Sequence, residues 1–206
     1  VKVDPGKFAV KAECEGEKFY TKSLIDKIEN VATDSGYKVK FFNQEYVIGD
    51  DSIPFDFDFE KHKIETKILV NLAISKLVDK GDKVNLVVGM PIEHWLDRER
   101  RMKYEQFIAS KSQMSMIERA VDTPMDFKIN KVIAVPESIG HVARHKDYQN
   151  RTVGVLDCGG ANFQGAVYKN GLPLRETCFT LNEGGYFYLN TCLLYTSPSP
   201  RDYAAS

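Results

Sequence analysis

The chain of 206 residues lacks the features that mark membrane, secreted and metal-cluster proteins. No run of 18 apolar residues is present, so no membrane-spanning helix is predicted. The first residues do not form a basic segment followed by an apolar one, so no export signal is expected among them. The four cysteines form no CxxC pair, and we expect them to be free thiols in a reducing cytoplasm.

The charge is balanced and two common nucleotide-binding motifs are missing. With 28 basic and 29 acidic residues the net charge is -1, which gives no basic field for direct contact with nucleic acid. Neither GxGxxG nor GxxxxGK[ST] follows any apolar run, which excludes a Rossmann or P-loop site. The apolar content of 43% is that of an ordinary globular protein of one or two domains.

The apolar pattern alternates between strand-like and helix-like periods. The first sixty residues are rich in β-branched and aromatic residues, and a helical period follows them. Gly81 stands where a C-cap glycine of that helix would be expected. The order predicts an α/β fold with a mixed sheet. Strands are expected at 18–22, 37–42, 44–48, 84–89, 114–117, 127–129, 131–135 and 175–181, and helices at 61–80, 96–108, 138–145 and from residue 184.

Two short glycine turns carry the chemistry. Asp4 and Gly6 form the first, and Asp157, Gly159 and Gly160 form the second, each between two strand-like runs. A strand–turn–strand of this kind presents backbone N–H groups to a phosphate and aims its carboxylate at the accompanying metal ion. The two turns together indicate a clamp on one phosphate chain, whereas each alone is also consistent with a surface turn with an Asx cap.

Two further residues fit such a clamp. Lys11 stands seven residues after Asp4 on the return strand, and this odd offset allows both side chains to face one pocket. Its ammonium would neutralise phosphate oxygens, although an incidental surface lysine remains the alternative. Glu137 follows a buried apolar run and could orient a water for attack on a γ-phosphoryl group. The alternative is that Glu137 only favours the dipole of a following helix.

The segment 50–59 alternates acids and phenylalanines. This alternation is typical of a half-buried edge strand that its acids keep soluble. A calcium site is the second interpretation, but the loop glycine and the closing glutamate are missing.

The running order of motifs resembles that of the actin-like ATPases. DxG with its lysine is followed by LVVGMP (86–91), VIAVPES (132–138), VLDCGG (155–160) and FQGAVY (163–168). More narrowly, the chain resembles the plasmid-segregation actins of the ParM/StbA-like group. The resemblance runs from Val1 to about Thr191. It implies the actin-like ATPase (ribonuclease H-like) fold. Residues 1–150 would form the complete first lobe with subdomains IA and IB, and 151–191 only the start of the second lobe.

The resemblance also assigns roles. The first phosphate loop would comprise Asp4, Gly6 and Lys11, and the second Asp157, Gly159 and Gly160. Asp4 and Asp157 would lie near Mg²⁺, and Glu137 would position the hydrolytic water of ATP. The family polymerises into filaments, and an adaptor bound to plasmid or phage DNA rides on the filament, so contact with DNA is indirect. One departure is Gln164, where a further acid is frequent.

Alternatives of the same fold are a sugar or acetate kinase and a chaperone-type ATPase, because a fold does not fix a function. The tail 192–206 resembles a translated sequencing-library adapter, so we expect it to be non-native. The gene would then be cut within its second lobe and would start a few residues late, as the missing Met suggests. On that hypothesis the full-length protein hydrolyses ATP, while this fragment is an inactive truncated product.

Overall fold

The computed structural model describes residues 1–31, 35–53, 61–118 and 121–189 of the chain. The expected tail at 192–206 and most of the segment 50–59, with both interpretations of it, lie outside these residues. Among the helices that are described, none is long and apolar enough to cross a membrane.

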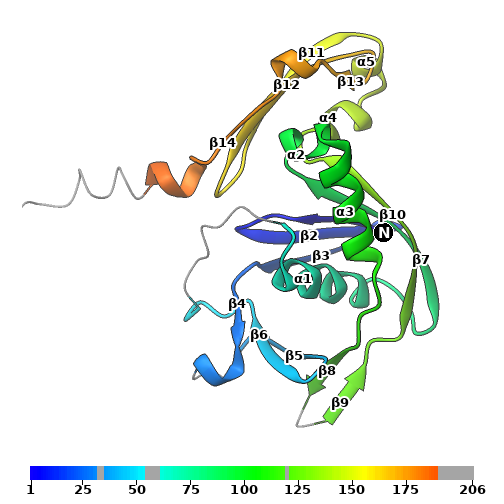
Figure 1. The fold of residues 1–206 in the computed structure, drawn as a ribbon, viewed down its shortest axis with the longest axis vertical. Helices are drawn as coiled ribbons and strands as arrows, with labels where there is room; N and C mark the ends of the chain where they lie inside the picture. Colours follow the sequence, from blue (N-terminus) through cyan, green and yellow to red (C-terminus); the bar gives the residue numbers. More distant parts are fainter. Residues whose placement is uncertain (32–34, 54–60, 119–120, 190–206) are drawn as a thin grey trace, which may run out of the picture.

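A mixed five-stranded sheet, the first sheet, forms the centre of the molecule (Figure 1). Its order is β10-β7-β1-β2-β3, with β1, β7 and β10 parallel and β1, β2 and β3 antiparallel. Val84, Leu86 and Val88 are buried at every second position of β7, as expected for a strand with one face in the core. The strands are β1 (Lys2–Pro5), β2 (Ala9–Cys14), β3 (Glu17–Lys22), β7 (Asp82–Met90) and β10 (Phe127–Pro136).

Helix α1 (Ile64–Ser75) packs against β1 and β2 and joins the first sheet to a second one. Its residues from Thr66 to Ile74 are all buried, which is typical of a helix enclosed on every side. The second sheet is antiparallel, in the order β4-β6-β5-β8-β9, and shares one hydrophobic cluster with α1 and the first sheet. Its strands are β4 (Ile25–Lys27), β5 (Tyr37–Phe41), β6 (Gln44–Ile48), β8 (Met114–Glu118) and β9 (Val121–Pro124), with the 3-10 turn η1 (Ile28–Asn30) after β4.

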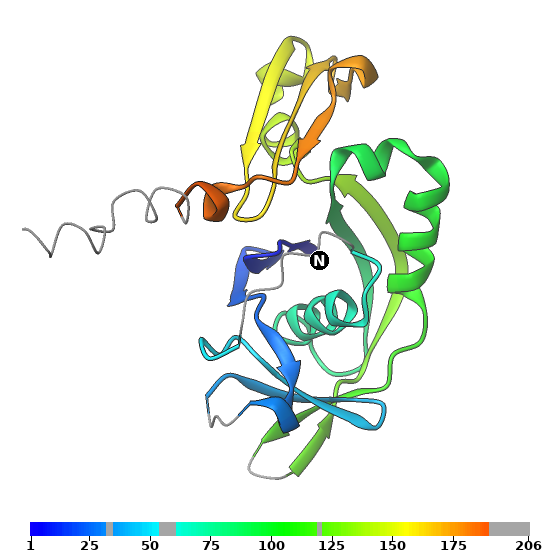
Figure 2. The ribbon, with the colours of Figure 1, turned by 60° about the vertical axis from the view of Figure 1, so that its left-hand side comes forward.

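The third sheet lies at the other end of the molecule from the second (Figures 1 and 2). It consists of the β11–β12 hairpin with β13 and β14 paired to β12. Its small core contains Val155, Ala166 and Tyr168 together with Ile92 and Val142 from two short helices. The elements here are α2 (Ile92–Leu96), α4 (Ile139–Arg144), α5 (Lys146–Gln149), β11 (Thr152–Cys158), β12 (Phe163–Lys169), β13 (Leu172–Pro173), η2 (Arg175–Thr177) and β14 (Phe179–Leu181).

The structure confirms the expected α/β order and corrects several boundaries. Gly81 has a φ of +87° but lies beyond the end of α1, so it serves a turn and not the helix cap. The helix expected at 96–108 divides at Asp97, whose side chain accepts hydrogen bonds from the next helix, α3 (Arg98–Ala109).

Further boundaries differ in the strands. The two strands expected at 127–129 and 131–135 are one strand, β10, with a register shift between Ile129 and Lys131. The expected strand at 175–181 begins as the 3-10 turn η2 and becomes a strand only at Phe179. Strands β4 and β9 were not predicted, because they are short and polar and pair only through tertiary contacts.

Candidate functional site

The first turn, residues 4–7 between β1 and β2, places an acid and a lysine side by side. Asp4 and Lys11 are direct partners in the antiparallel register, so both side chains point from the same face of the sheet. Their odd spacing thus places them on one face, and a pocket shared by both side chains stays a prediction. Gly6 is required here, because a Cβ would lie 2.7 Å from the Ala9 carbonyl oxygen. The hydroxyl of Ser23 donates a hydrogen bond to the Gly6 carbonyl and fixes the turn.

The second turn, residues 157–160 between β11 and β12, packs against Phe8, the residue that follows the first turn. A Cβ on Gly160 would lie 2.7 Å from the Cβ of Phe8. The carbonyl of Gly160 accepts a hydrogen bond of 2.8 Å from the Tyr186 N–H, and that of Gly159 one of 2.9 Å from Gly185. The two glycine turns, far apart in the sequence, therefore lie close together, and their action as a phosphate clamp stays a prediction.

Glu137 lies at the end of β10, in the same region. Its side chain is only 10% exposed. The Oε2 atom accepts a hydrogen bond of 2.8 Å from Gln164 Nε2, and Oε1 lies 2.9 Å from Lys61 Nζ. A Cβ on Gly89 would lie 3.1 Å from Glu137 Cγ and 3.5 Å from Asp4 Oδ1. The absence of a side chain at Gly89 thus lets the two carboxylates approach one another.

Gln164 connects the acids of the first and third sheets. Its amide nitrogen donates to Glu137 Oε2 and, at 3.3 Å, to Asp157 Oδ2. Its amide oxygen accepts a hydrogen bond of 3.1 Å from the Ile92 N–H. The residue is 1% exposed, so these partners provide the hydrogen bonds that burial would otherwise remove. In the sequence it is only a departure from the family pattern, and its bridging role is visible only in three dimensions.

The site concentrates negative charge. Burial, together with the nearby charges of Glu137 and Asp157, raises the pKa of Asp4 to about 6, although Lys61 and Lys11 oppose the change. Asp4, Glu137 and Asp157 therefore interact electrostatically across two sheets.

This donor set suits a hard cation that shares its shell with phosphate and water. Within the described parts of the chain, no three His, Cys, Asp or Glu side chains converge into a complete metal site. Mg²⁺ usually binds through one or two carboxylates together with phosphates and waters, so an incomplete protein shell fits it. Asp4 and Asp157 are the residues that would hold such an ion.

Two residues of this region were missed by the sequence analysis. Lys61 is 4% exposed and its Nζ donates a hydrogen bond to the Pro5 carbonyl of the first turn. Burial raises the pKa of Tyr104, and the charges of Glu137 and Asp4 raise it further. Lys61 could not be singled out, because in the sequence it is one polar residue among several at the start of a helical pattern.

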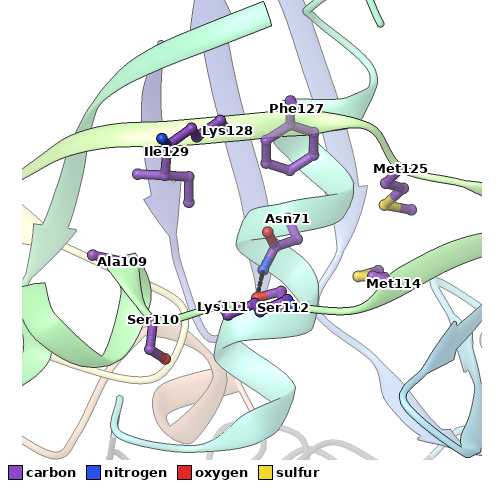
Figure 3. A pocket seen from close by; sticks show the side chains of 10 residues that line it. All are labelled: Asn71, Ala109, Ser110, Lys111, Ser112, Met114, Met125, Phe127, Lys128 and Ile129. Atoms are coloured by element: carbon purple, nitrogen blue, oxygen red, sulfur yellow. Dashed lines mark hydrogen bonds between the residues drawn. The ribbon is translucent and has the colours of Figure 1, made fainter. Parts of the chain in front are cut away.

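Two hollows open on the surface. One, of about 480 Å³, adjoins the first turn and is lined in part by Gly6, Lys7 and Ser23. The other, of about 370 Å³, lies between α1, the end of α3 and β10 (Figure 3). Asn71 projects into it and donates a hydrogen bond of 3.3 Å to the Ser112 hydroxyl. No predicted site residue lines the second hollow.

Solved structures of low sequence identity share the fold. The apo psk41 ParM protein superposes with a TM-score of 0.69 at 18% identity, over 100% of this chain and 72% of that one. The Alp12 filament structure gives 0.67 at 20% identity, over 90% and 61%. The archaeal actin homologue Ta0583 in complex with ADP gives 0.70 at 14% identity, over 100% and 70%. The chain thus spans 61–72% of the length of these proteins.

The family comparison rests on sequence. No protein with a curated description matches the chain. The family model described as "Actin like proteins N terminal domain" matches residues 3–140, which is more than half of the chain. The matched region contains the first turn, β7, β10 and Glu137, and the structural neighbours have the same actin-like fold. The chain therefore belongs to the family of actin-like proteins.

Proposed function

We propose that this chain binds Mg-ATP between its two glycine turns, as the phosphate-binding part of an ATP-hydrolysing actin-like protein. The observation that carries the proposal is the meeting of the two turns, with Asp4, Glu137 and Asp157 gathered around them. Surface turns with incidental acids would have no reason to converge from separate sheets, and the charge repulsion at Asp4 is an energetic cost to the fold.

In the proposed complex each group has a chemical role. The amides of Gly6, Gly159 and Gly160 bind phosphate oxygens, and the Lys11 ammonium neutralises part of their charge. The divalent cation, when bound, screens the charge of the phosphates.

Glu137 would act on the attacking water. It accepts a hydrogen bond from the water. The water oxygen then bonds to the γ-phosphorus while the bond to the bridging oxygen breaks, and a proton of the water passes to the Glu137 carboxylate, giving ADP and phosphate.

Filament formation for plasmid or phage DNA segregation is the proposed role of the whole protein. Its support is the fold shared with the Alp12 filament, with a 15-stranded ParM filament from Clostridium botulinum and with an AlfA filament bound to AMPPNP. An adaptor on the DNA would contact the filament in the cytoplasm, in keeping with the net charge of -1. Residues 1–150 would act as one lobe and 151–191 as the start of another.

Calorimetric titration of the chain with Mg-ATP tests the nucleotide site. We expect the chain to bind Mg-ATP. Asp157→Asn should weaken this binding by about tenfold or more, because the charged contact of this carboxylate with the cation on the phosphates is lost. Glu137→Ala should slow ATP turnover by about 100-fold and leave ATP-dependent light scattering of the whole protein intact.

Glu118→Ala, at an exposed acid of β8, is the matched control and should change neither measurement. Absence of Mg-ATP binding would refute the proposed site. Transfer of the γ-phosphate to a sugar or to acetate, in place of hydrolysis, would favour the kinase alternative. Absence of any polymer at high protein concentration would refute the filament role.

A further inference from the structure

Two lysines of the described chain are buried, and burial of a lysine needs an explanation. Lys61 is 4% exposed and Lys67 is 3% exposed. A buried ammonium costs several kcal/mol of solvation unless carboxylates or carbonyl oxygens replace its water. The partners of each lysine therefore indicate why it is there.

Lys67 has a structural role. Its Nζ donates hydrogen bonds to the carbonyl oxygens of Phe107 at 2.9 Å and Ser110 at 2.8 Å, and to the Ser110 hydroxyl. These oxygens lie at the C-terminal end of α3, where carbonyl groups lack partners within the helix. Lys67 caps a helix and has no partner in the candidate site among these contacts.

Lys61 instead joins two parts of the candidate site. Its Nζ lies 2.9 Å from Glu137 Oε1 and also donates to the Pro5 carbonyl in the first turn. The contact with Oε1 is an ion pair, and among the described residues Oε1 accepts no hydrogen bond. The lysine thus holds the carboxylate in place by charge, while Oε1 can still accept a hydrogen bond from another donor.

A second buried oxygen in this region also lacks a hydrogen bond. The Tyr104 hydroxyl receives and donates no hydrogen bond within the described part of the chain, although the residue is 1% exposed. Its ring contacts that of His62, the neighbour of Lys61, with 5.8 Å between centroids. Buried polar atoms without partners are rare in native proteins and point to a bound water or ligand group.

We propose that Lys61 is a positioning residue that fixes Glu137 so that its Oε1 faces the attacking water. This inference rests on the proposed ATPase function and adds to it. Gln164 holds Oε2 and Lys61 holds Oε1, so the carboxylate is fixed from both sides. Because Lys61 also binds the first turn, a phosphate seated on that turn would be connected to the group that orients the water.

The test compares Lys61→Met with the matched control Lys67→Met. We measure the Mg-ATP dissociation constant and the single-turnover hydrolysis rate in the 206-residue chain and in the whole protein. Lys61→Met should lower the hydrolysis rate by about 100-fold with a change in affinity below about fivefold. Lys67→Met should lower the urea midpoint of unfolding and change the hydrolysis rate less than about threefold. Lys61→Arg, which keeps the charge, should restore the rate to within about tenfold of the unmodified protein.

A double-mutant cycle tests the ion pair without nucleotide. Lys61→Met and Glu137→Gln should each lower the folding equilibrium constant about 100-fold, because each leaves one buried group without its partner. In the double variant the folding equilibrium constant should fall by far less than the product of the two single-variant losses. If the free-energy losses of the two single variants simply added in the double variant, the proposed ion pair of Lys61 and Glu137 would be overturned.

The outcomes separate this inference from the proposed function. Turnover in the unmodified protein, with the same rate in Lys61→Met as in Lys67→Met, would overturn only the role of Lys61. No turnover in either form of the unmodified protein would overturn both.

Discussion

The two glycine hairpins share one sequence pattern but lie in different surroundings. The first hairpin, β1–β2, lies inside the five-stranded sheet, between β7 and β3, and packs against α1. The second hairpin, β11–β12, has β11 at the edge of its sheet. Val10 of the first hairpin is 0% exposed, whereas Leu156 of the second is 70% exposed. A local pattern of strand, acid, glycine and strand thus predicts the turn but not how firmly its surroundings hold it.

The turns also differ in what fixes them. The first is held within its own sheet region, where Ser23 contacts the Gly6 carbonyl through its hydroxyl and the Phe8 carbonyl through its N–H at 3.0 Å. The second depends on the backbone of Gly184 to Tyr186 and on its contact with Phe8. We therefore expect the second turn to be the more easily displaced, and the following predictions test this difference.

The largest effect should come from adding a methyl group at either turn. Gly6→Ala would clash with the backbone oxygen of Ala9, and Gly160→Ala with the Phe8 side chain, each at 2.7 Å. Either substitution should weaken Mg-ATP binding by about 10- to 100-fold, because overpacking typically costs about 1–3 kcal/mol of free energy. Calorimetric titration measures the loss.

The two turns should differ in whether a second substitution restores the Mg-ATP affinity. Phe8→Gly removes the obstacle to Gly160→Ala and should recover most of its affinity, but it should not help Gly6→Ala, whose obstacle is backbone. Gly154→Ala in β11 is the control, because a Cβ there meets no atom within 4 Å. Equal rescue of both variants would contradict the proposed contact between the turns.

The next effect concerns the acid of the first turn. Burial and neighbouring carboxylates raise the pKa of folded Asp4 to about 6 from an ordinary value of 3.8. Asp4→Asn should therefore stabilise the fold at pH 7.5 by on the order of 2–3 kcal/mol while weakening Mg-ATP binding. Urea unfolding measures the gain, with Asp122→Asn at the exposed ion pair with Lys40 as the control.

The same shift sets the pH dependence. The folded state holds the Asp4 proton more tightly than the unfolded state, so this stabilising contribution is complete below about pH 3.8 and is lost as the pH rises through about 6. The groups that act on Asp4 are Glu137, Lys61, Lys11 and Asp157. The stability difference between Asp4→Asn and the unmodified chain should grow from pH 4 to pH 7 and then level off. A destabilised Asp4→Asn at pH 7.5 would mean that the two lysines outweigh burial.

The smallest effect is expected at Leu156, and it appears when the hydrophobic surroundings of the two hairpins are compared. Val10→Ala should lower the free energy of unfolding by about 2 kcal/mol, because it leaves a cavity in the main core. Leu156→Ala should change it by less than about 0.5 kcal/mol, because its side chain is mostly in water. Urea unfolding at low protein concentration measures both. A comparable loss for Leu156→Ala would show that this face is covered in solution.

Much of the local structure could be predicted because local rules decide it. The strand at 44–48 and the partnership of Asp4 with Lys11 follow from period-two alternation and hairpin geometry. The break at Asp97 was missed although its capping chemistry is local, because the charged sequence around it continues a helical pattern. The register shift in β10 was not predictable, since it depends on the pairing with β7.

The sequence by itself determined the α/β class, the two glycine turns and the acids beside them, because turn residues and hydrophobic periods act over a few neighbours. Only the tertiary structure decided that the turns touch at Gly160 and Phe8 and that Gln164 bridges Glu137 and Asp157. The same holds for Lys61, whose burial against Glu137 is a contact between segments far apart in the chain. Such pairings depend on how sheets pack, which no local pattern encodes.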